Sequence, residues 1–324
     1  MTVTPPEIVL HINLEDLSNW RQHKRLAFFD RVACLCETYH LPYRVVSRHP
    51  DLTRSCRGAS DGRLHLVEDG RVQGAGWLNA AVAYLLGFWH LDPSGVLADS
   101  SARFDRYTPR SVDWGSANAY FKALRQRFVT PRLSRYNPPR ARDAALPQGS
   151  IAVFLQGRTP YKAGQCDVPM HEIIVAACQQ ANGRAVVVKP HPLSIIDCAR
   201  AMAQAADAGA RFSVFEGNIH DLLASCAVTV SVNSAAAMEG FLHRKPAILF
   251  GRSDFESLVT RVTQPEGFGR GLHEALSTER RYAKMMYWYF TRHCLDTDAD
   301  DFESRLFVGF DKVGFGRARF GVEP

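Results

Sequence analysis

The sequence lacks the motifs that mark several large classes of enzyme and binding protein. It contains neither a GxGxxG segment nor a Walker A motif, so nothing in it indicates a dinucleotide cofactor or ATP. Its eight cysteines include no CxxC pair, which argues against a zinc site and predicts free thiols. No paired aspartates follow a predicted strand, so we expect no metal site.

Long apolar runs and targeting signals are also missing. No stretch approaches the roughly 18–20 apolar residues that a membrane-spanning helix needs. Residues 1–7 have neither a basic region nor a long apolar core, so they do not resemble a secretory signal. We therefore expect a cytoplasmic protein.

The composition is that of a globular protein. With 324 residues the chain is about two domains long, and 46% of its residues are apolar and 22% charged. The net charge is +6, and much of it comes from arginines between Arg106 and Arg142. This basic stretch either faces an anionic glycan, a nucleotide or membrane lipid, or is a solvated surface. Aromatic residues are not interleaved with it in a nucleic-acid motif, so nucleic acid is not an expected partner.

The most informative segment is Val186-Val187-Val188-Lys189-Pro190-His191-Pro192. Three valines predict a buried strand, and the two prolines end it because they fix φ and remove two backbone donors. Ligands of open α/β sheets bind beyond the carboxyl ends of the strands. Lys189 and His191 are therefore candidate ligands of an anion. The alternative is a strand end whose side chains only face water.

A second candidate site follows about forty residues later. Residues 226–232 predict another buried strand, and Asn233 and Ser234 then begin a helix that continues to Leu242. Such a turn presents unpaired backbone N–H groups that suit a phosphate. Glu239 lies on the same helix, where it could reach a ribose. The alternative is an ordinary strand–helix unit with a serine cap.

Taken together, these pieces resemble a known family. The strand with KPHP, then FEGNIHDLL, then VTVSVNSAAAMEGFLHRKPAILFG, resembles the capsule polysaccharide biosynthesis family over roughly residues 150–255. The resemblance implies a GT-B-type glycosyltransferase related to bacterial β-Kdo transferases, which use CMP-Kdo. It also implies that the HP histidine and a serine-rich helix start contact the CMP phosphate.

The family pattern carries over to particular residues of this chain. His191 matches the HP histidine, Ser234 with Asn233 matches the helix start, and Glu239 matches an acidic residue of that helix. One departure is Ala235, which leaves a single hydroxyl at the turn. The TDYSS-like turn of the related CDP-glycerol phosphotransferases is absent, which argues against glycerol-phosphate transfer.

Other candidates lie in predicted loops. Gly157 and Arg158 follow the strand 151–155, where they would allow close approach of a ligand and clamp an anion. Glu216 either binds a ribose or base edge, or caps the helix that begins near residue 219. Asp92 is either the base that deprotonates an acceptor hydroxyl or the cap of a β-turn. The predicted binding residues are thus Lys189, His191, Glu216, Asn233, Ser234, Glu239, Gly157 and Arg158, and the predicted catalytic residues are Asp92 and His191.

The predicted fold is α/β and GT-B-like, with two Rossmann-type domains, a cleft between them and a C-terminal helix that crosses back. Residues 1–145 form the acceptor-side domain, residues 146–275 the nucleotide-sugar-binding domain, and residues 276–324 a helical segment packed on the first domain. Residues 131–149 read as a linker. Further predicted elements are strands at 8–12, 43–46 and 246–251, helices at 20–39, 77–86, 116–129, 169–180, 195–208 and 279–294, and a hairpin at 64–72.

The resemblance implies metal-independent transfer of an acidic sugar, Kdo, from a CMP-activated donor to a surface or capsular polysaccharide. The CMP-sugar is then a co-substrate and no cofactor is needed. A glycan or glycolipid acceptor is the second partner, and peripheral association with the inner face of the inner membrane stays open. The alternatives are a GT-B enzyme that uses a UDP- or GDP-sugar, and a non-catalytic glycan-binding or assembly protein that retains the fold.

Overall fold

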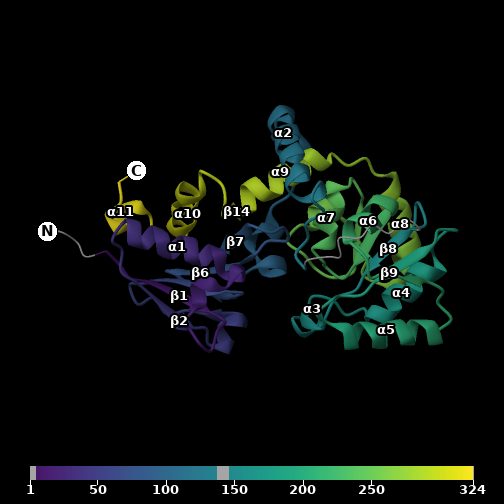
Figure 1. Cartoon of the computed structure of the whole chain (residues 1–324), viewed down its shortest axis with the longest axis horizontal. Helices are drawn as coiled ribbons and strands as arrows, with labels where there is room; N and C mark the ends of the chain where they lie inside the picture. Colours follow the sequence, from purple (N-terminus) through teal and green to yellow (C-terminus); the bar gives the residue numbers. More distant parts are fainter. Residues whose placement is uncertain (1–4, 137–145, 324) are drawn as a thin grey trace. The chain divides into compact units, whose positions relative to one another are not determined.

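The computed structural model describes residues 5–136 and 146–323 and divides the chain into two units (Figure 1). The first unit comprises Met1–Asp105 and Phe290–Pro324, and the second comprises Arg106–Tyr289. The division near residue 145 that we expected is replaced by one at Asp105. The reason is that the guanidinium of Arg125 donates to the carbonyl of Leu242, which ties the preceding helix to the second unit. Residues 137–145 of the predicted linker lie outside the described residues.

The first unit contains a six-stranded sheet in the order β14-β7-β6-β4-β1-β2. Its strands are β1 (Ile8–Ile12), β2 (Tyr43–Ser47), β4 (Leu64–Glu68), β6 (Trp77–Val82), β7 (Phe88–Asp92) and β14 (Leu295–Asp296). Strands β2, β1, β4 and β6 are parallel to one another. Strand β7 runs antiparallel to β6, and β14 runs antiparallel to β7. The C-terminal segment thus contributes a strand to this sheet.

One face of this sheet is covered by helices from both ends of the chain (Figure 1). They are α1 (Ala27–Thr38), α10 (Phe302–Asp311) and α11 (Arg317–Phe320). Alternate strand residues such as Leu10 and Leu66 are fully buried against Phe28 and Phe310. Because successive side chains of a strand point to opposite faces, this alternation fixes which face receives the helices.

Three predictions for the first unit are wrong, namely the helices at 20–39 and 77–86 and the hairpin at 64–72. The helix expected at 20–39 is two short 3₁₀ turns, Trp20–Gln22 and Lys24–Leu26, followed by α1. The expected hairpin does not form, because β5 (Val72–Gln73) pairs in parallel with β3 (Cys56–Arg57) and not with β4.

The segment predicted as a helix at 77–86 is the strand β6. Leu78 and Ala80 face the core under α1, and Asn79 is fully buried on the opposite side. Its side chain bonds the backbone N–H and carbonyl of Val72. A strand buried on both faces has a continuous apolar run, which composition alone does not distinguish from a buried helix.

The second unit contains a fully parallel sheet in the order β10-β9-β8-β11-β12-β13. Its strands are β8 (Ile151–Phe154), β9 (Val186–Lys189), β10 (Ser213–Val214), β11 (Val228–Ser231), β12 (Ala247–Leu249) and β13 (Thr260–Arg261). The first strand of the unit, β8, lies inside the sheet, and later strands are added first on one side of it and then on the other. This is the 3-2-1-4-5-6 order of the doubly wound Rossmann fold.

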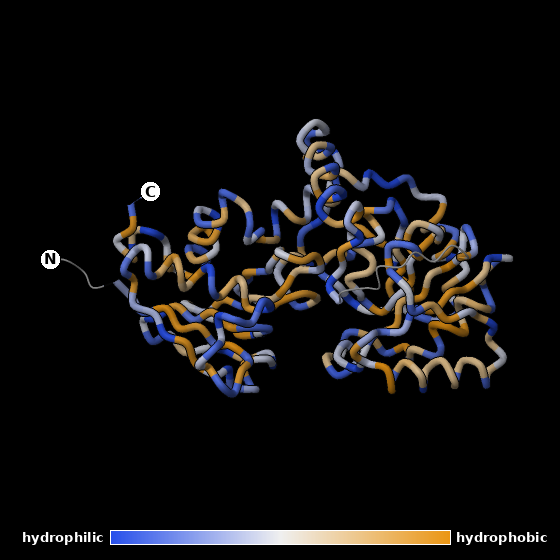
Figure 2. Tube along the Cα trace, in the orientation of Figure 1, coloured by the Kyte–Doolittle hydropathy of each residue, from blue (hydrophilic) through white to orange (hydrophobic). Residues whose placement is uncertain are grey.

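Helices cover both faces of the second sheet (Figure 1). The helices of this unit are α2 (Trp114–Leu124), which continues as a π turn at Arg125–Val129, α3 (Thr159–Lys162), α4 (Met170–Gln179), α5 (Ile195–Asp207), α6 (Ile219–Ser225), α7 (Ala236–Leu242) and α8 (Phe268–Ser277). The helix α9 (Tyr282–His293) begins in this unit and ends in the first. The predicted helices at 116–129, 169–180, 195–208 and 279–294 are therefore confirmed. The inner strands β8, β9, β11 and β12 are largely apolar (Figure 2), as strands buried on both faces require.

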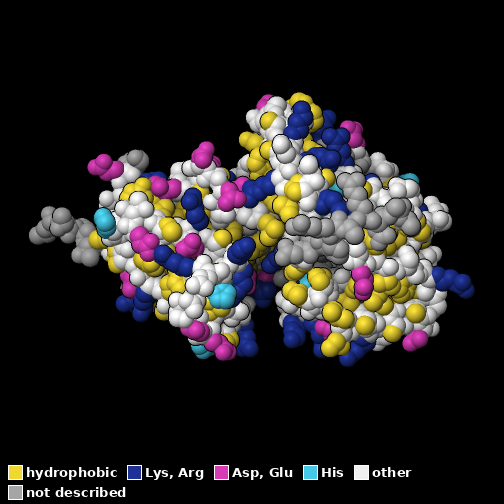
Figure 3. Space-filling model, viewed as in Figure 1, with side chains coloured by type: hydrophobic (Ala, Val, Ile, Leu, Met, Phe, Trp, Pro, Cys, Tyr) yellow, Lys and Arg dark blue, Asp and Glu magenta, His cyan; other side chains and the backbone are white. Residues whose placement is uncertain are grey.

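The basic stretch contains arginines that make contacts within the protein. Lys and Arg side chains gather over α2 (Figure 3). Arg132 forms an ion pair with Asp221 at 2.5 Å, and the Arg125 guanidinium lies partly buried against α7. Part of this stretch is therefore structural.

All eight cysteines are free thiols. Within residues 5–136 and 146–323, no helix is long and apolar enough to cross a bilayer. The same residues hold no cluster of three or more His, Cys, Asp or Glu side chains placed to bind a metal ion.

Candidate functional site

A cavity of about 500 Å³ lies at the carboxyl edge of the second sheet. Residues from the ends of β8, β9 and β10, and from the turn between β11 and α7, line it. In a doubly wound sheet this edge is where ligands bind, beside the strand at which the order reverses. The lining residues are Ser134, Arg135, Tyr136, Phe154, Leu155, Lys189, Pro190, His191, Pro192, Ile195, Ala199, Met202, Glu216, Gly217, Ile219, Ser234, Ala235, Ala236 and Glu239.

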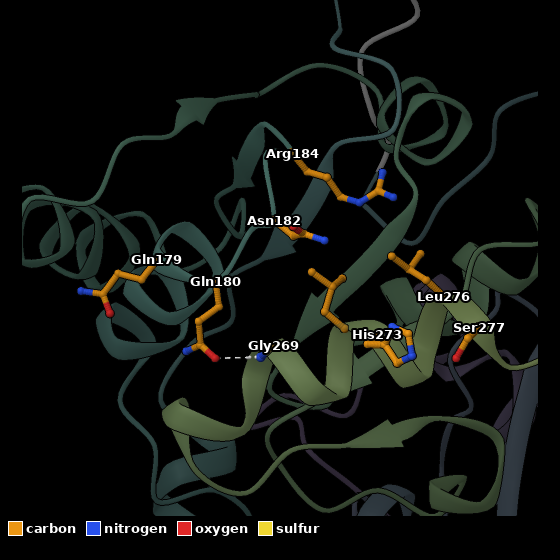
Figure 4. Close-up of a pocket in the computed structure, with 9 residues that line it drawn as sticks. Gln179, Gln180, Asn182, Arg184, Gly269, His273, Leu276 and Ser277 are labelled. Carbon is orange, nitrogen blue, oxygen red and sulfur yellow. Dashed lines mark hydrogen bonds between the residues drawn. The ribbon is translucent and has the colours of Figure 1, made fainter.

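A larger hollow of about 660 Å³ lies between the end of α4 and α8 (Figure 4). Two of the long polar side chains that line it, those of Gln180 and Arg184, are bonded to the backbone. Gln180 accepts from the N–H of Gly269 and donates to the carbonyl of Pro265, and Arg184 donates to the carbonyl of Gly149. It lies beside the amino end of β9, away from the edge at which ligands of such sheets bind. We therefore place the candidate site in the smaller cavity.

The structure brings together five of the eight predicted binding residues: Lys189, His191, Glu216, Ser234 and Glu239 all line the cavity. Asn233, Gly157 and Arg158 do not.

The three remaining residues have other surroundings. The amide nitrogen of Asn233 donates to Gln165 Oε1 and to the carbonyl of Arg252, both at 2.9 Å, so Asn233 joins neighbouring loops. A Cβ at Gly157 would lie 2.5 Å from Ser194 Oγ. Glycine is therefore needed here because the side chain of Ser194 packs against it, and not because a ligand does. Arg158 is exposed.

The orientation of His191 follows from the prolines beside it. The backbone N–H of Leu193 donates to His191 Nδ1 at 3.2 Å, so the proton of the neutral ring is on Nε2. Burial, and secondarily the charge of Arg135, lowers the pKa of His191. A neutral ring with a free Nε2–H can donate a hydrogen bond to an anion in the cavity.

Lys189 is held where β9 ends. Its Nζ donates to the carbonyl of Gly217 at 2.6 Å and lies 5.2 Å from the centre of the Phe215 ring. Burial lowers the pKa of Lys189, and the negative charges of Glu216 and Glu239 oppose that shift. Because an ammonium group has three donors, two remain for a ligand.

Glu239 is 5% exposed and is the most strongly perturbed acid of the site. Burial raises its pKa to about 7, against the stabilising effects of a hydrogen bond from Ser134 and of the charges of Arg135 and Lys189. Near neutral pH this carboxyl group therefore exists in both protonation states, so it can either donate to or accept from a ligand.

The turn between β11 and α7 differs from expectation. The N–H groups of Asn233, Ser234, Ala236 and Ala237 all donate within the chain. Ser234 Oγ is one of the acceptors, 3.2 Å from the nitrogen of Ala236. The prediction of several unpaired N–H groups at this turn is therefore wrong except for Ala235, and what the turn offers a ligand is chiefly this N–H and the Ser234 hydroxyl. The helix that follows has only seven residues.

Sequence reasoning missed Ser134, Arg135 and Tyr136, which it assigned to a linker. The ring of Tyr136 lies edge-on to that of His191, with the ring centres 4.9 Å apart. The only signal in the sequence was the high arginine content of this region. That signal did not indicate which arginine would line a cavity.

Comparison with known proteins finds a family whose model matches part of this chain. Residues 159–269 match the model of the family described as capsule polysaccharide biosynthesis protein. The predicted resemblance to this family is confirmed. The matched segment includes the KPHP strand end and the turn with Ser234, so it supplies most of the cavity. No curated protein sequence matches the chain.

Two solved structures have a similar fold to this chain. One is the KpsC β-Kdo 2,7-transferase of Thermosulfurimonas dismutans, with a TM-score of 0.52 and 13% identity, covering 95% of this chain and 99% of the other. The other is the KpsC β-Kdo 2,4-transferase of the same organism, with a TM-score of 0.51 and 17% identity, covering 88% and 89%. At these identities the likeness shows the fold, two Rossmann-like α/β domains of GT-B type.

Asp92, the predicted base, lies in the first unit and does not line the cavity. Its Oδ1 accepts from the N–H groups of Ser94 at 2.7 Å and Gly95 at 3.3 Å. Its Oδ2 accepts from the N–H of Ser101 at 2.9 Å and from that residue's hydroxyl at 2.5 Å. Four hydrogen bonds occupy a carboxylate that is 7% exposed. Asp92 thus shapes its own loop, as the turn-cap alternative predicted, and this is a poor arrangement for a base.

Proposed function

We propose that this protein is a GT-B glycosyltransferase that transfers an acidic sugar, Kdo, from a CMP-activated donor to a surface or capsular polysaccharide. The observation that carries the proposal is the cavity at the carboxyl edge of the second sheet, lined by Lys189, His191, Ser234 and Glu239. These residues lie within the segment that matches the capsule polysaccharide biosynthesis family.

The chemistry of the lining suits a nucleotide that leaves as an anion. The Nε2–H of His191 and the Lys189 ammonium would donate to the phosphate of CMP and stabilise the charge that develops as the sugar departs. Donors that are fixed before the reaction and shielded from water contribute most to this kind of stabilisation. The anchoring of both side chains by backbone groups meets the first of these conditions, and their partial burial contributes to the second.

The remaining lining groups fit the nucleoside. Glu239 can accept from a ribose hydroxyl when it is ionised, and Pro190, Ile195 and Met202 offer apolar surface to a base. A cavity of about 500 Å³ lies within the size range of small-ligand sites. The donor and a glycan acceptor are thus the proposed partners, and the CMP-sugar would act as co-substrate.

A thermal-shift comparison of CMP, CDP, UDP and GDP tests the donor. Ligand at a hundred times its Kd stabilises the native state by about 2.7 kcal/mol, which corresponds to roughly 5–10 °C for a domain of this size. We expect this shift with CMP or CDP and not with GDP. A shift with UDP alone rejects the Kdo assignment and favours a UDP-sugar.

Incubation with a CMP-Kdo donor then tests catalysis. Slow release of CMP, accelerated by a capsular acceptor, is expected of a transferase. Tight binding of CMP without any release would instead identify a glycan-assembly protein that retains the fold.

A further inference from the structure

Arg135 differs from Lys189 because its side chain is exposed and is not bonded to any residue that the structure describes. Its guanidinium forms no hydrogen bond and no ion pair with any residue that the structure describes, and its one ring contact is with Tyr136 at 5.9 Å. Lys189, in contrast, is bonded to the carbonyl of Gly217, and Arg132 is paired with Asp221. Arg135 nevertheless lines the cavity.

The segment before Arg135 is anchored at three successive residues. Arg132 binds Asp221 of α6 at 2.5 Å, and the carbonyl of Leu133 accepts from His220 Nε2 at 2.8 Å. Ser134 is 9% exposed, and its hydroxyl donates to Glu239 of α7. The backbone that carries Arg135 is therefore held against α6 and α7, two helices that pack on the second sheet.

A hydrogen bond between two histidines supports the middle anchor. His220 Nε2 donates to the Leu133 carbonyl, so its Nδ1 accepts from His243 Nε2 at 2.9 Å. His243 directly follows α7, and His220 lies on α6. These contacts fix the backbone beside Arg135, although the side chain of Arg135 itself is exposed.

The guanidinium is close to the groups that would meet a phosphate. Its charge acts on both His191 and Glu239, which face the cavity. The turn after β11 offers few backbone donors, since the N–H groups of Asn233, Ser234 and Ala236 are already bonded. An anion in this cavity would therefore be held chiefly by side chains, with the N–H of Ala235 as the remaining backbone donor of the turn.

We propose that Arg135 binds the phosphate of the nucleotide, as a charged arm of the site beside Lys189 and His191. The identity of the nucleotide rests on the function proposed above. A guanidinium presents two parallel N–H groups to two phosphate oxygens, whereas a lysine ammonium acts as a single point of charge. Arg135→Lys should therefore restore only part of what Arg135→Ala removes.

Calorimetric titration of the full chain with CMP and with cytidine tests this assignment. A charge-assisted hydrogen bond contributes enough to change affinity about 10- to 150-fold. We expect Arg135→Ala to weaken CMP by about this factor and cytidine by less than about twofold, because cytidine has no phosphate. Arg211→Ala is the matched control, since Arg211 is exposed, does not line the cavity and makes no side-chain bond within the described chain.

Three results would overturn the assignment. They are an unchanged CMP affinity in Arg135→Ala, an equal loss for CMP and cytidine, and a loss as large in Arg211→Ala. If the wild-type protein binds UDP but not CMP, the proposed donor is wrong, and the same comparison made with UDP and uridine decides the role of Arg135. If it binds none of these nucleotides, both proposals fail.

Discussion

The hydroxyl of Ser134 donates a hydrogen bond to the carboxyl group of Glu239, and both residues line the same cavity. One residue follows the π turn after α2 and the other lies on α7, so the bond joins segments that are far apart in the sequence. It also keeps a buried acid beside the proposed phosphate site. The protonation of Glu239 should therefore control how well the cavity accepts an anion.

The first prediction concerns pH. Burial raises the pKa of Glu239 to about 7, so the carboxyl group is neutral below this pH and negative above it. The affinity for CMP should therefore fall as pH rises from about 6 to 8.5, and Glu239→Gln should remove this part of the dependence. Titration of CMP itself is common to both proteins and cancels in the comparison. Identical pH profiles for the two proteins would contradict the prediction.

The same group makes a prediction about stability. Because its pKa is raised in the folded state, Glu239 contributes stability that is fully present below its unfolded value of 4.5 and is lost as pH rises through about 7. Glu239→Gln should thus raise the melting temperature relative to wild type more at pH 8 than at pH 5. Melting curves at the two pH values measure this, and an equal difference at both would show that the acid is not buried as described.

His191→Ala tests the proposed phosphate contact on β9. Loss of the Nε2–H donor should weaken CMP about 10- to 150-fold while the fold survives, since His191 is only half-buried. His90→Ala is the contrasting variant, because His90 is 1% exposed in the first unit and its loss should lower the melting temperature. Calorimetry and melting curves on both proteins separate the two roles. A large drop in melting temperature with unchanged affinity in His191→Ala would make it a packing residue.

Asn233→Ala tests whether this residue is structural. Its amide group donates to Gln165 and to the carbonyl of Arg252, and its Oδ1 accepts from Gln156. Removing these bonds should lower the free energy of unfolding by about 1–3 kcal/mol. The CMP affinity of the folded protein should change less than in His191→Ala. Denaturant unfolding and calorimetry report the two quantities, and the reverse order of effects would restore Asn233 as a ligand.

Asp92→Asn tests the role of the carboxylate in the first unit. A general base contributes about 10²- to 10⁴-fold to the rate, whereas an asparagine retains an oxygen that can accept from the N–H groups of Ser94 and Gly95. We expect kcat to fall by less than about tenfold and the melting temperature to drop, because the Ser101 contacts are disturbed. A thousandfold loss of kcat at an unchanged melting temperature would identify Asp92 as the base.

Much of the second unit could be predicted from local sequence. The valines of β9 and the prolines that follow it determine a buried strand with an abrupt end, and that end places Lys189 and His191 at the carboxyl edge of the sheet. The direction of the His191 ring also has a local cause, because the N–H that fixes it belongs to Leu193. Interactions of this kind, between residues close in the sequence, can be predicted from the local sequence alone.

Other features depended on contacts between distant residues, which no local pattern reveals. The segment at Trp77–Val82 is a strand because it pairs with β4 and β7 and is covered on both sides, although its composition equally suits a helix. The backbone donors of the turn at Ser234 are unavailable partly because Gln156, 77 residues away, bonds Asn233. The strand and helix patterns and the family resemblance indicated the fold class, and the end of β9 indicated Lys189 and His191 as site residues. Only the tertiary structure decided that His220, 87 residues from Leu133, holds Arg135 at the cavity, because hydrogen bonds across such separations form only once the sheet has assembled.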